Sequence, residues 1–301
     1  MLTRREFGTL ALAAGVVRLT SDTTLEAAVD DAASDSKVTS VRLGVQTYSF
    51  RNLPRTADGD AIAPVIAAMK RCALSECELW SEHVEPLGHT REGLRRFRLD
   101  TPLDRFRAIG RQFNAAGITV YAYNYTFRSD FDDAEIDRGF ETARAIGARI
   151  ITASTTLAVA KRVVPFAEKH RMTVAMHGHS NITDPNQFAT PASFAAAQQM
   201  SPYFKINLDI GHFTAAGFDP VPFIREHHTA ISNLHIKDMK RGIPDSYQPW
   251  GQGDTPIRDV LQLLKKERWP IRAYIEYEYP GAGTPIDEVK KCYEFTKRAL
   301  A

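Results

Sequence analysis

Short apolar runs of strand character alternate with helical patterns from Val41 to the end of the chain. The runs are rich in β-branched and aromatic residues, which pack well on a pleated sheet. The eight predicted strands span 41–50, 76–80, 119–125, 149–154, 173–179, 205–212, 233–238 and 273–278. A window with the apolar spacing of an amphipathic helix follows each strand. These windows lie near 60–72, 101–116, 133–147, 158–171, 191–200, 220–229, 256–267 and 285–299.

Helix-start and helix-stop residues support these boundaries. Asp132 and Asp133 can cap the window at 133–147, and Gly117 and Gly147 follow helical windows just ahead of strands. Glycine adopts the left-handed conformation that ends many helices. Prolines lie at or near the start of most windows, where a missing N–H costs little. They are Pro64, Pro102, Pro165, Pro191, Pro220, Pro256 and Pro285.

Eight strand–helix units in residues 41–301 predict a single (β/α)8 TIM barrel of the α/β class. Strict alternation requires right-handed crossovers and a parallel sheet, and about 260 residues is the usual size of a closed barrel. An open doubly wound sheet is the alternative. That fold usually carries a glycine-rich phosphate loop after its first strand, and SFRNLPRTADGD at 49–60 has no such pattern.

Residues 1–40 are predicted to be a twin-arginine-type export signal and a linker. Arg4 and Arg5 precede a short apolar stretch of small residues, and Asp, Ser, Thr and Ala dominate 21–40. We therefore expect an exported protein, periplasmic or extracellular, with no stable membrane insertion after processing. An amphipathic first helix with a chance arginine pair is the alternative.

Charge and composition narrow the class of partner. The formal net charge is only +2, with 38 basic and 36 acidic residues interspersed along the chain. This balance disfavours a nucleic-acid partner and favours a small-molecule ligand. Cys72, Cys77 and Cys292 lack the spacing of a thiolate metal site or a disulfide framework. Whether the chain forms a homo-oligomer stays open.

Each of the last four predicted strands ends with a potential metal ligand. These ligands are His177, Asp209, His235 and Glu276. The ends of neighbouring parallel strands converge in a barrel, so these four side chains can meet at one point. Two nitrogens and two carboxylates suit one divalent ion such as Mn²⁺, Zn²⁺, Fe²⁺ or Co²⁺, whereas Ca²⁺ prefers oxygen ligands alone. Taken singly, Asp209 can cap a loop, His235 can be a core histidine and Glu276 can pair with Lys237.

Further polar residues surround these ligands. Side chains two residues apart in a strand point to the same face. His179 therefore shares a face with His177, Glu278 with Glu276, and Lys237 with His235. His212 follows Asp209 at the strand–loop junction.

Two more segments can contribute to a site. Glu78 lies beside Trp80, and an acid next to an aromatic ring is a common way to hold a sugar, although core packing explains Trp80 equally well. The loop WGQGDTPI at 250–257 can close over a ligand or offer N–H groups to an anion, or it can be a turn capped by Asp254.

The chain resembles the sugar phosphate isomerase/epimerase superfamily of xylose isomerase-like TIM barrels, from about Val41 to the C-terminus. The motifs that carry the resemblance are GVQTYSF, ECELW, LDIGH, HIKD, the G-x-G-D loop at 251–254, and IEYE. The resemblance implies that Asp209, His235 and Glu276 are metal ligands and that the substrate is a small carbohydrate. Gln46, in the first motif, joins Glu78, Trp80 and His212 as an expected substrate-binding residue.

The fifth strand departs from the family pattern, because His177 stands where the family has a glutamate. In the epimerases that glutamate and the one on the eighth strand act as opposed acid and base. A metal-bound imidazole has no free lone pair, so epimerisation by two bases requires another base here. Elimination needs only one base and a polarised oxygen.

The expected function is therefore that of a metal-dependent isomerase or epimerase acting on a sugar, keto-sugar or polyol through an enediol or enediolate. Glu276 or Glu278 is expected to move the proton, while Lys237 and His179 stabilise charge on oxygen. The alternatives are a lyase, dehydratase or keto-glycoside-cleaving enzyme, and a barrel that binds carbohydrate without catalysis. A phosphodiester endonuclease on the same barrel is disfavoured by the near-neutral charge.

Overall fold

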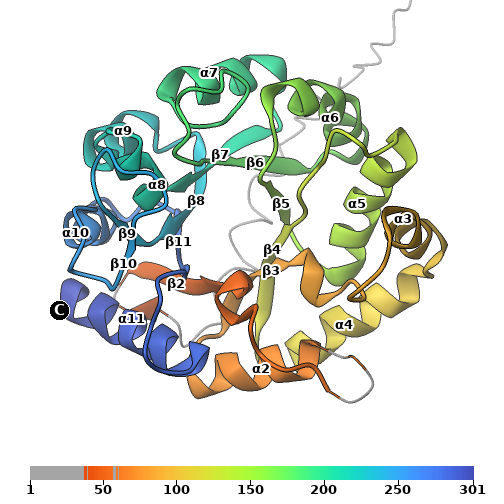
Figure 1. Cartoon of the computed structure of the whole chain (residues 1–301), viewed down its shortest axis with the longest axis horizontal. Coiled ribbons are helices and arrows are strands. Elements are labelled where there is room, and N and C mark those ends of the chain that lie inside the picture. The colour runs from red at the N-terminus through yellow and green to blue at the C-terminus, as the bar shows by residue number, and fades with distance from the viewer. Residues whose placement is uncertain (1–36, 39, 57–58, 60) are drawn as a thin grey trace, which may run out of the picture. The chain divides into compact units, whose positions relative to one another are not determined.

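The computed structural model describes residues 37–38, 40–56, 59 and 61–301 (Figure 1). The predicted export signal and nearly all of the predicted linker lie outside these residues, so that prediction stays open. Among the described residues, none of the helices combines the length and the apolar character that crossing a membrane requires.

A closed barrel of eight parallel strands confirms the predicted fold. The order around the barrel is β2-β11-β8-β7-β6-β5-β4-β3, and β2 also pairs with β3, so the ring has no open edge. A short strand, β1 (Lys37–Val38), adds to β2 in antiparallel orientation. The barrel strands are β2 (Val41–Gln46), β3 (Glu76–Trp80), β4 (Thr119–Asn124), β5 (Ile150–Ala153), β6 (Thr173–His177), β7 (Phe204–Asp209), β8 (Ile231–Ile236) and β11 (Arg272–Ile275).

Eight helices cover the outside of the barrel and match the predicted windows closely (Figure 1). They are α2 (Ile62–Arg71), α4 (Leu103–Ala115), α5 (Asp133–Ile146), α6 (Leu157–His170), α7 (Pro191–Met200), α9 (Pro220–His227), α10 (Ile257–Glu267) and α11 (Pro285–Leu300). Apolar residues of the strands and of the inner helix faces form the core between the two layers, as Val45, Leu208 and Val260 do with no exposed surface.

The structure confirms the predicted helix ends, with one exception. Asp132 accepts a hydrogen bond from the N–H of Glu135 and forms a capping box with it. Gly117 and Gly147 have φ of 74° and 95°, the left-handed values expected after a helix. Pro165 lies inside α6 rather than near its start. A proline there leaves one carbonyl of the preceding turn without its usual helical partner.

Several short elements were not predicted. The helix α3 (Arg91–Asp100) fully buries none of its residues, and its few apolar residues, such as the half-buried Leu94 and Phe97, lie among charged ones, so its apolar signal in the sequence is short. The predicted strands at 41–50 and 205–212 end early, because the 3-10 helix η1 (Thr47–Phe50) follows β2 and the helix α8 (Ile210–Ala215) follows β7. The 3-10 helix η2 (Ser81–His83) follows β3, and β9 (Asp238–Met239) pairs with β10 (Tyr247–Gln248) in the loop before α10.

Candidate metal centre

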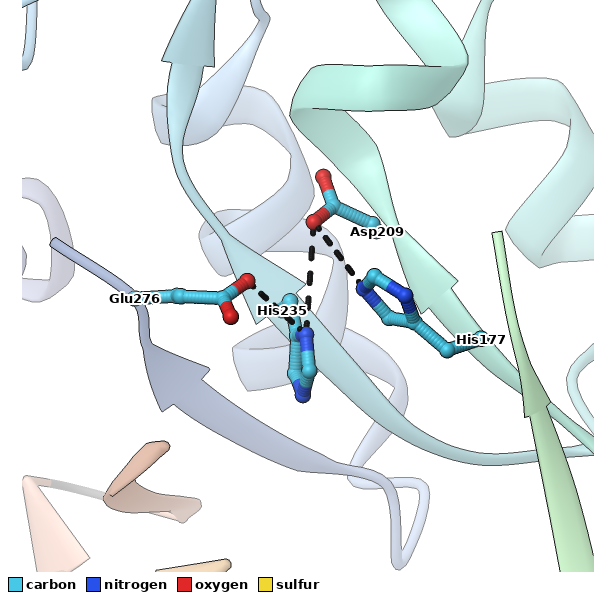
Figure 2. Close-up of side chains that lie close together, drawn as sticks. All are labelled: His177, Asp209, His235 and Glu276. Atoms are coloured by element: carbon cyan, nitrogen blue, oxygen red, sulfur yellow. Dashed lines mark hydrogen bonds and ion pairs between the residues drawn. The ribbon is translucent and has the colours of Figure 1, made fainter. Parts of the chain in front are cut away.

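The four predicted metal ligands converge at the C-terminal end of the barrel (Figure 2). His177 and Asp209 are the last residues of β6 and β7, His235 is the penultimate residue of β8, and Glu276 directly follows β11. One ligand atom of each lies within 4.8 Å of the others, and all four residues are buried.

Strand register explains this convergence. Asp209 pairs directly with His235 across β7 and β8, and the N–H of Glu276 donates to the carbonyl of Ile236, which extends the alignment beyond β11. His177 is paired with Asn207, two residues before Asp209. Neighbouring parallel strands therefore carry the four side chains to one level of the barrel.

The site contains buried atoms whose hydrogen-bonding capacity is not used. His235 Nδ1 lies 2.9 Å from Glu276 Oε2 and 4.0 Å from Asp209 Oδ2, and His177 Nε2 lies 3.4 Å from Asp209 Oδ2. Nevertheless, neither His235 Nδ1 nor Glu276 Oε2 makes a hydrogen bond of acceptable geometry with any described residue. Buried polar atoms are nearly always satisfied, so atoms that are not mark the place of a ligand. Two nitrogens and two carboxylate oxygens fit a divalent transition metal.

Neighbouring residues orient the ligands. His235 Nε2 lies 2.9 Å from Glu78 Oε2, so Nδ1 is the ring nitrogen that faces the other ligands. Ser154 Oγ lies 3.1 Å from His177 Nδ1, so His177 Nε2 is the nitrogen that faces the site. The N–H of His212 donates to Asp209 Oδ1 at 2.8 Å and leaves Oδ2 to the site. Such outer contacts select the tautomer and the ring orientation of metal ligands.

Glu78 has a different place from the one predicted. It is completely buried in the barrel interior, and both of its oxygens are engaged. Oε1 accepts hydrogen bonds from Gln46 at 2.6 Å, Asn124 at 3.2 Å and Thr152 at 2.6 Å, and Oε2 accepts from Asn233 at 3.1 Å as well as from His235. These contacts give Glu78 a role in supporting His235, and its role in substrate binding stays a prediction.

Gln46 likewise supports Glu78, and its role in substrate binding stays a prediction. Only 2% of Gln46 is exposed, its amide nitrogen donates to Glu78, and its amide oxygen accepts from the N–H of Tyr48 at 3.1 Å. Asn207 and Asn233 were missed by the sequence analysis. Asn207 Nδ2 lies 3.1 Å from His235 Nε2, and Asn233 donates to Asn207 Oδ1 at 3.0 Å. Asparagine in the middle of an apolar strand was the available signal, because this residue is depleted in strands.

Lys237 lies at the centre of the carboxylates. Its Nζ is 3.0 Å from Asp209 Oδ2 and 2.9 Å from Glu276 Oε2, and it forms a short contact with Glu278 Oε2. A Cβ on Gly211 would meet Lys237 Cγ at 2.2 Å, so this glycine leaves the space for the lysine stem. Burial alone would lower the pKa of Lys237, but the three acids raise it well above the usual value. The ammonium therefore neutralises the same two oxygens that face a metal.

The electrostatics of the site separate ionised from neutral groups. Burial would raise the pKa of Asp209 and of Glu276, but Lys237 and neighbouring histidines lower both below the usual values, so both carboxyls are ionised. Burial raises the pKa of Glu278 despite the opposing effect of Lys237. Burial, with the nearby His177 and Lys237, lowers the pKa of His179 to about 3, so this imidazole is neutral.

The remaining predicted residues lie around the ligands at different distances. The ring centroid of His179 is 4.8 Å from that of His177 and 5.2 Å from that of His212. His212 Nδ1 is buried and has no hydrogen-bond partner among the described residues. Trp80 is half-buried and packs edge-on against Tyr48 with ring centroids 4.9 Å apart, and its role in substrate binding stays a prediction.

The N–H groups of the glycine-rich loop at 250–257 bind a carboxylate of the protein itself. The carboxylate of Asp238 accepts N–H groups from Gly251 at 2.7 Å, Gly253 at 3.0 Å and Thr255 at 3.2 Å. Asp254, the predicted cap of this turn, accepts the N–H of Arg241, which lies outside the loop, at 3.0 Å. The N–H groups of the loop therefore hold Asp238, one residue beyond Lys237.

Solved structures share this barrel. The IOLI protein with a bound zinc atom is 15% identical, with a TM-score of 0.62 over 86% of this chain and 98% of that chain. D-psicose 3-epimerase with D-tagatose, from Clostridium cellulolyticum H10, is 10% identical, with a TM-score of 0.62 over 86% and 99%. A sugar phosphate isomerase/epimerase from Parabacteroides distasonis ATCC 8503 is 14% identical, with a TM-score of 0.58 over 88% and 96%. At these identities the likeness shows the fold alone.

A search of curated proteins gave no match. The family model described as xylose isomerase-like TIM barrel matches residues 81–299, which include all four converging side chains. The chain belongs to the xylose isomerase-like TIM barrel family.

Proposed function

We propose that this protein is a metal-dependent enzyme that moves a proton on a carbon next to a carbonyl group of a sugar, keto-sugar or polyol. The observation that carries the proposal is the buried set of two histidines and two carboxylates, in which His235 Nδ1 and Glu276 Oε2 have no hydrogen-bond partner among the described residues. The similar structures named for a sugar phosphate isomerase/epimerase and for an epimerase with a bound sugar support a carbohydrate substrate.

His177, Asp209, His235 and Glu276 would hold the metal. A bound divalent ion supplies polarisation of a carbonyl oxygen and of a neighbouring hydroxyl. Mn²⁺, Zn²⁺, Fe²⁺ and Co²⁺ all suit the donor set, and the zinc atom bound in the IOLI structure makes Zn²⁺ the first ion to test.

Glu278 is the best placed group for proton transfer. It lies outside the set of four ligands, contacts Lys237 and keeps 15% of its side chain exposed. Burial raises its pKa, which brings a carboxyl closer to the range in which a general base works near neutral pH. The Lys237 ammonium lies beside it and can stabilise negative charge that develops on a substrate oxygen.

The environment of His177 favours chemistry with a single base. Its Nδ1 lies against Ser154 and its Nε2 faces Asp209. Because each ring nitrogen already has a neighbour in the protein, neither is free to accept a proton from a substrate. The family glutamate at this position is therefore not replaced by an equivalent base. This favours elimination, or isomerisation with return of the proton by the same group, over epimerisation by two opposed bases.

The test is a proton-exchange experiment with metal-loaded protein in D₂O. Ketoses, inososes and 3-keto-glycosides are incubated with the protein and followed by NMR, and chelated protein is the control. We expect metal-dependent exchange of one substrate proton, with isomerisation or elimination as the net reaction. A protein with one equivalent of metal that leaves every compound unchanged would be a carbohydrate-binding barrel without catalysis.

We also propose that the protein acts outside the cytoplasm, on the basis of Arg4 and Arg5 ahead of an apolar stretch. Changing both arginines to lysine tests this, because the twin-arginine route should no longer accept the chain. Equal export of the variant and the parent protein in cell fractions would argue against it.

A further inference from the structure

A cavity adjoins the candidate metal centre. Its volume is about 450 Å³, within the range of about 300–1,000 Å³ for small-molecule sites. Ser154 and His179 line it, and both also contact His177, one through a hydroxyl 3.1 Å from Nδ1 and the other through rings 4.8 Å apart. A ligand in this cavity is therefore separated from the metal centre by single side chains.

Backbone contacts hold the walls of the cavity in place. The loop between β6 and α7 folds back on the start of α6, where Thr156 pairs with Gln187 as a β-bridge and the N–H of Leu157 donates to Asn186 at 2.8 Å. The N–H of His179 donates to the carbonyl of Phe188 at 2.8 Å, and Phe188 is fully buried. The cavity is thus a preformed part of the fold.

Polar side chains with unused hydrogen-bonding groups line this cavity. Within the described part of the chain, the side chains of Thr126, Arg128, Ser129 and Gln187 make no hydrogen bond or ion pair, although all four line the cavity. Thr155 lines it as well, but its hydroxyl donates to the carbonyl of Phe127 at 2.9 Å. The cavity thus offers hydroxyl, amide and guanidinium groups to a ligand.

The charge of the lining indicates a neutral ligand. Arg128 is exposed and lies within electrostatic reach of Glu82 and Asp130. The acids offset its field, so this cavity lacks the positive excess by which proteins select phosphates or carboxylates. Donors and acceptors without net charge match a ligand that carries several hydroxyl groups.

We infer that this cavity binds a second sugar ring, so that the preferred ligand is a disaccharide or another glycosylated sugar rather than a monosaccharide. One ring would occupy the metal centre, and the second ring would contact Thr126 and Gln187. This inference rests on the proposed function, since it assigns the substrate class of the same site.

Binding measurements on the metal-loaded full chain test this inference without the need for turnover. D-glucose, cellobiose, maltose and trehalose are titrated and followed by ligand-observed NMR. At least one disaccharide should bind about tenfold more tightly than D-glucose, the gain expected from two additional hydrogen bonds. The double variant Thr126→Val and Gln187→Leu should reduce that preference to about twofold or less, with unchanged metal content and unchanged glucose affinity.

A matched control is Gln112→Leu, because Gln112 lines a different cavity. This variant should keep the preference for the disaccharide. The inference is overturned if no disaccharide binds more tightly than glucose, or if the double variant keeps the full preference. A protein that prefers a disaccharide but exchanges no substrate proton would support this cavity and refute the proposed enzyme activity.

Discussion

The two halves of the barrel use buried polar side chains in opposite ways. In the first half, Gln46, Asn124 and Thr152 all donate hydrogen bonds to Glu78, and this network uses its polar atoms internally. In the second half, His235 Nδ1 and Glu276 Oε2 are also buried, but apart from ion pairs with each other and with Lys237 they make no hydrogen bond of acceptable geometry among the described residues. Polarity inside a barrel therefore does not by itself mark a functional site. Buried polar atoms without a hydrogen bond mark one where they converge with other potential ligands, whereas Trp250 Nε1 also has no hydrogen-bond partner among the described residues but lies outside the set of four.

Position along the strand accounts for the difference. Glu78 is in the middle of β3 and projects into the closed interior, where other strands surround it. His177 and Asp209 end their strands, so their side chains reach the face of the barrel where loops leave room for a ligand. The comparison between the two halves leads to the following predictions, from the largest expected effect to the smallest.

Asp209→Asn should abolish metal binding. The amide oxygen can still accept the N–H of His212 and cap α8, but the negative charge that faces the metal is lost. We expect metal affinity to fall by more than the about 10–100-fold typical of outer contacts, with an unchanged circular dichroism spectrum. Asp219→Asn is the matched control, because Asp219 caps α9 and should keep full metal content. Equal metal in both variants by elemental analysis would contradict the site.

Glu278→Gln and Glu276→Gln should both lower kcat, by roughly two to four orders of magnitude, the usual worth of general acid–base catalysis. Glu276 is in the set of four ligands and Glu278 is not, so only Glu276→Gln should also lose metal. Activity assays with parallel metal analysis separate the two effects. Near-normal turnover by Glu278→Gln would indicate that Glu276, and not Glu278, transfers the proton.

Glu78→Gln should weaken metal binding by about 10–100-fold, although Glu78 is not a ligand, because it orients His235. Glu76→Gln is the matched control on the same strand. Glu76 is also buried and accepts a hydrogen bond from Tyr274 at 3.0 Å, so its loss should lower stability without changing metal affinity. Chelator competition gives the affinity, and thermal unfolding gives the stability. Equal metal affinity in the two variants would contradict the supporting role of Glu78.

His83, in the first half of the barrel, should make the free energy of unfolding depend on pH. Burial lowers the pKa of His83 to about 4, and His83 Nε2 lies 2.9 Å from the carbonyl of Thr47. The unfolded chain therefore binds more protons between the unfolded pKa of about 6.5 and the folded value, so stability is full above about pH 6.5 and falls as the pH drops. The loss should be about 2 kcal/mol at about pH 5.

Urea unfolding at neutral and acidic pH measures this effect. His83→Gln should reduce the loss of stability on acidification, whereas His228→Gln should keep it, since His228 is a half-buried histidine at the end of α9. An identical pH dependence in parent and His83→Gln would show that the loss comes from other groups.

His177→Glu should have the smallest effect on the metal, since carboxylate oxygen and imidazole nitrogen both bind at about 2.0–2.2 Å. We expect metal content to be kept and some epimerisation to be gained, because a second carboxylate then faces the substrate. Elemental analysis and NMR of the product stereochemistry measure the two outcomes. If His177→Ala keeps both metal and activity, the fourth ligand is His179 or Glu278 instead.

The sequence by itself determined the barrel fold and the end of the barrel at which the potential metal ligands lie. Alternating strand and helix patterns leave few topologies, and closure follows from eight such units. Strands end where the apolar pattern ends, so His177, Asp209, His235 and Glu276 could each be placed at the same end of the barrel from the sequence. The predicted helices α5 and α10 bury several residues each, whereas α3 fully buries none and was missed.

Only the tertiary structure decided what each polar residue contacts. The two-residue period of a strand tells which side a residue faces but not how deep along the barrel axis it lies, so Glu78 was expected at the substrate and is found beneath His235. The sequence left open whether the N–H groups of the loop at 250–257 face an anion or belong to a turn, and in the structure those of Gly251 and Gly253 donate to the Asp238 carboxylate. Hydrogen bonds between strands and loops far apart in the sequence depend on the three-dimensional register of the closed barrel, and a pattern along one segment does not contain that information.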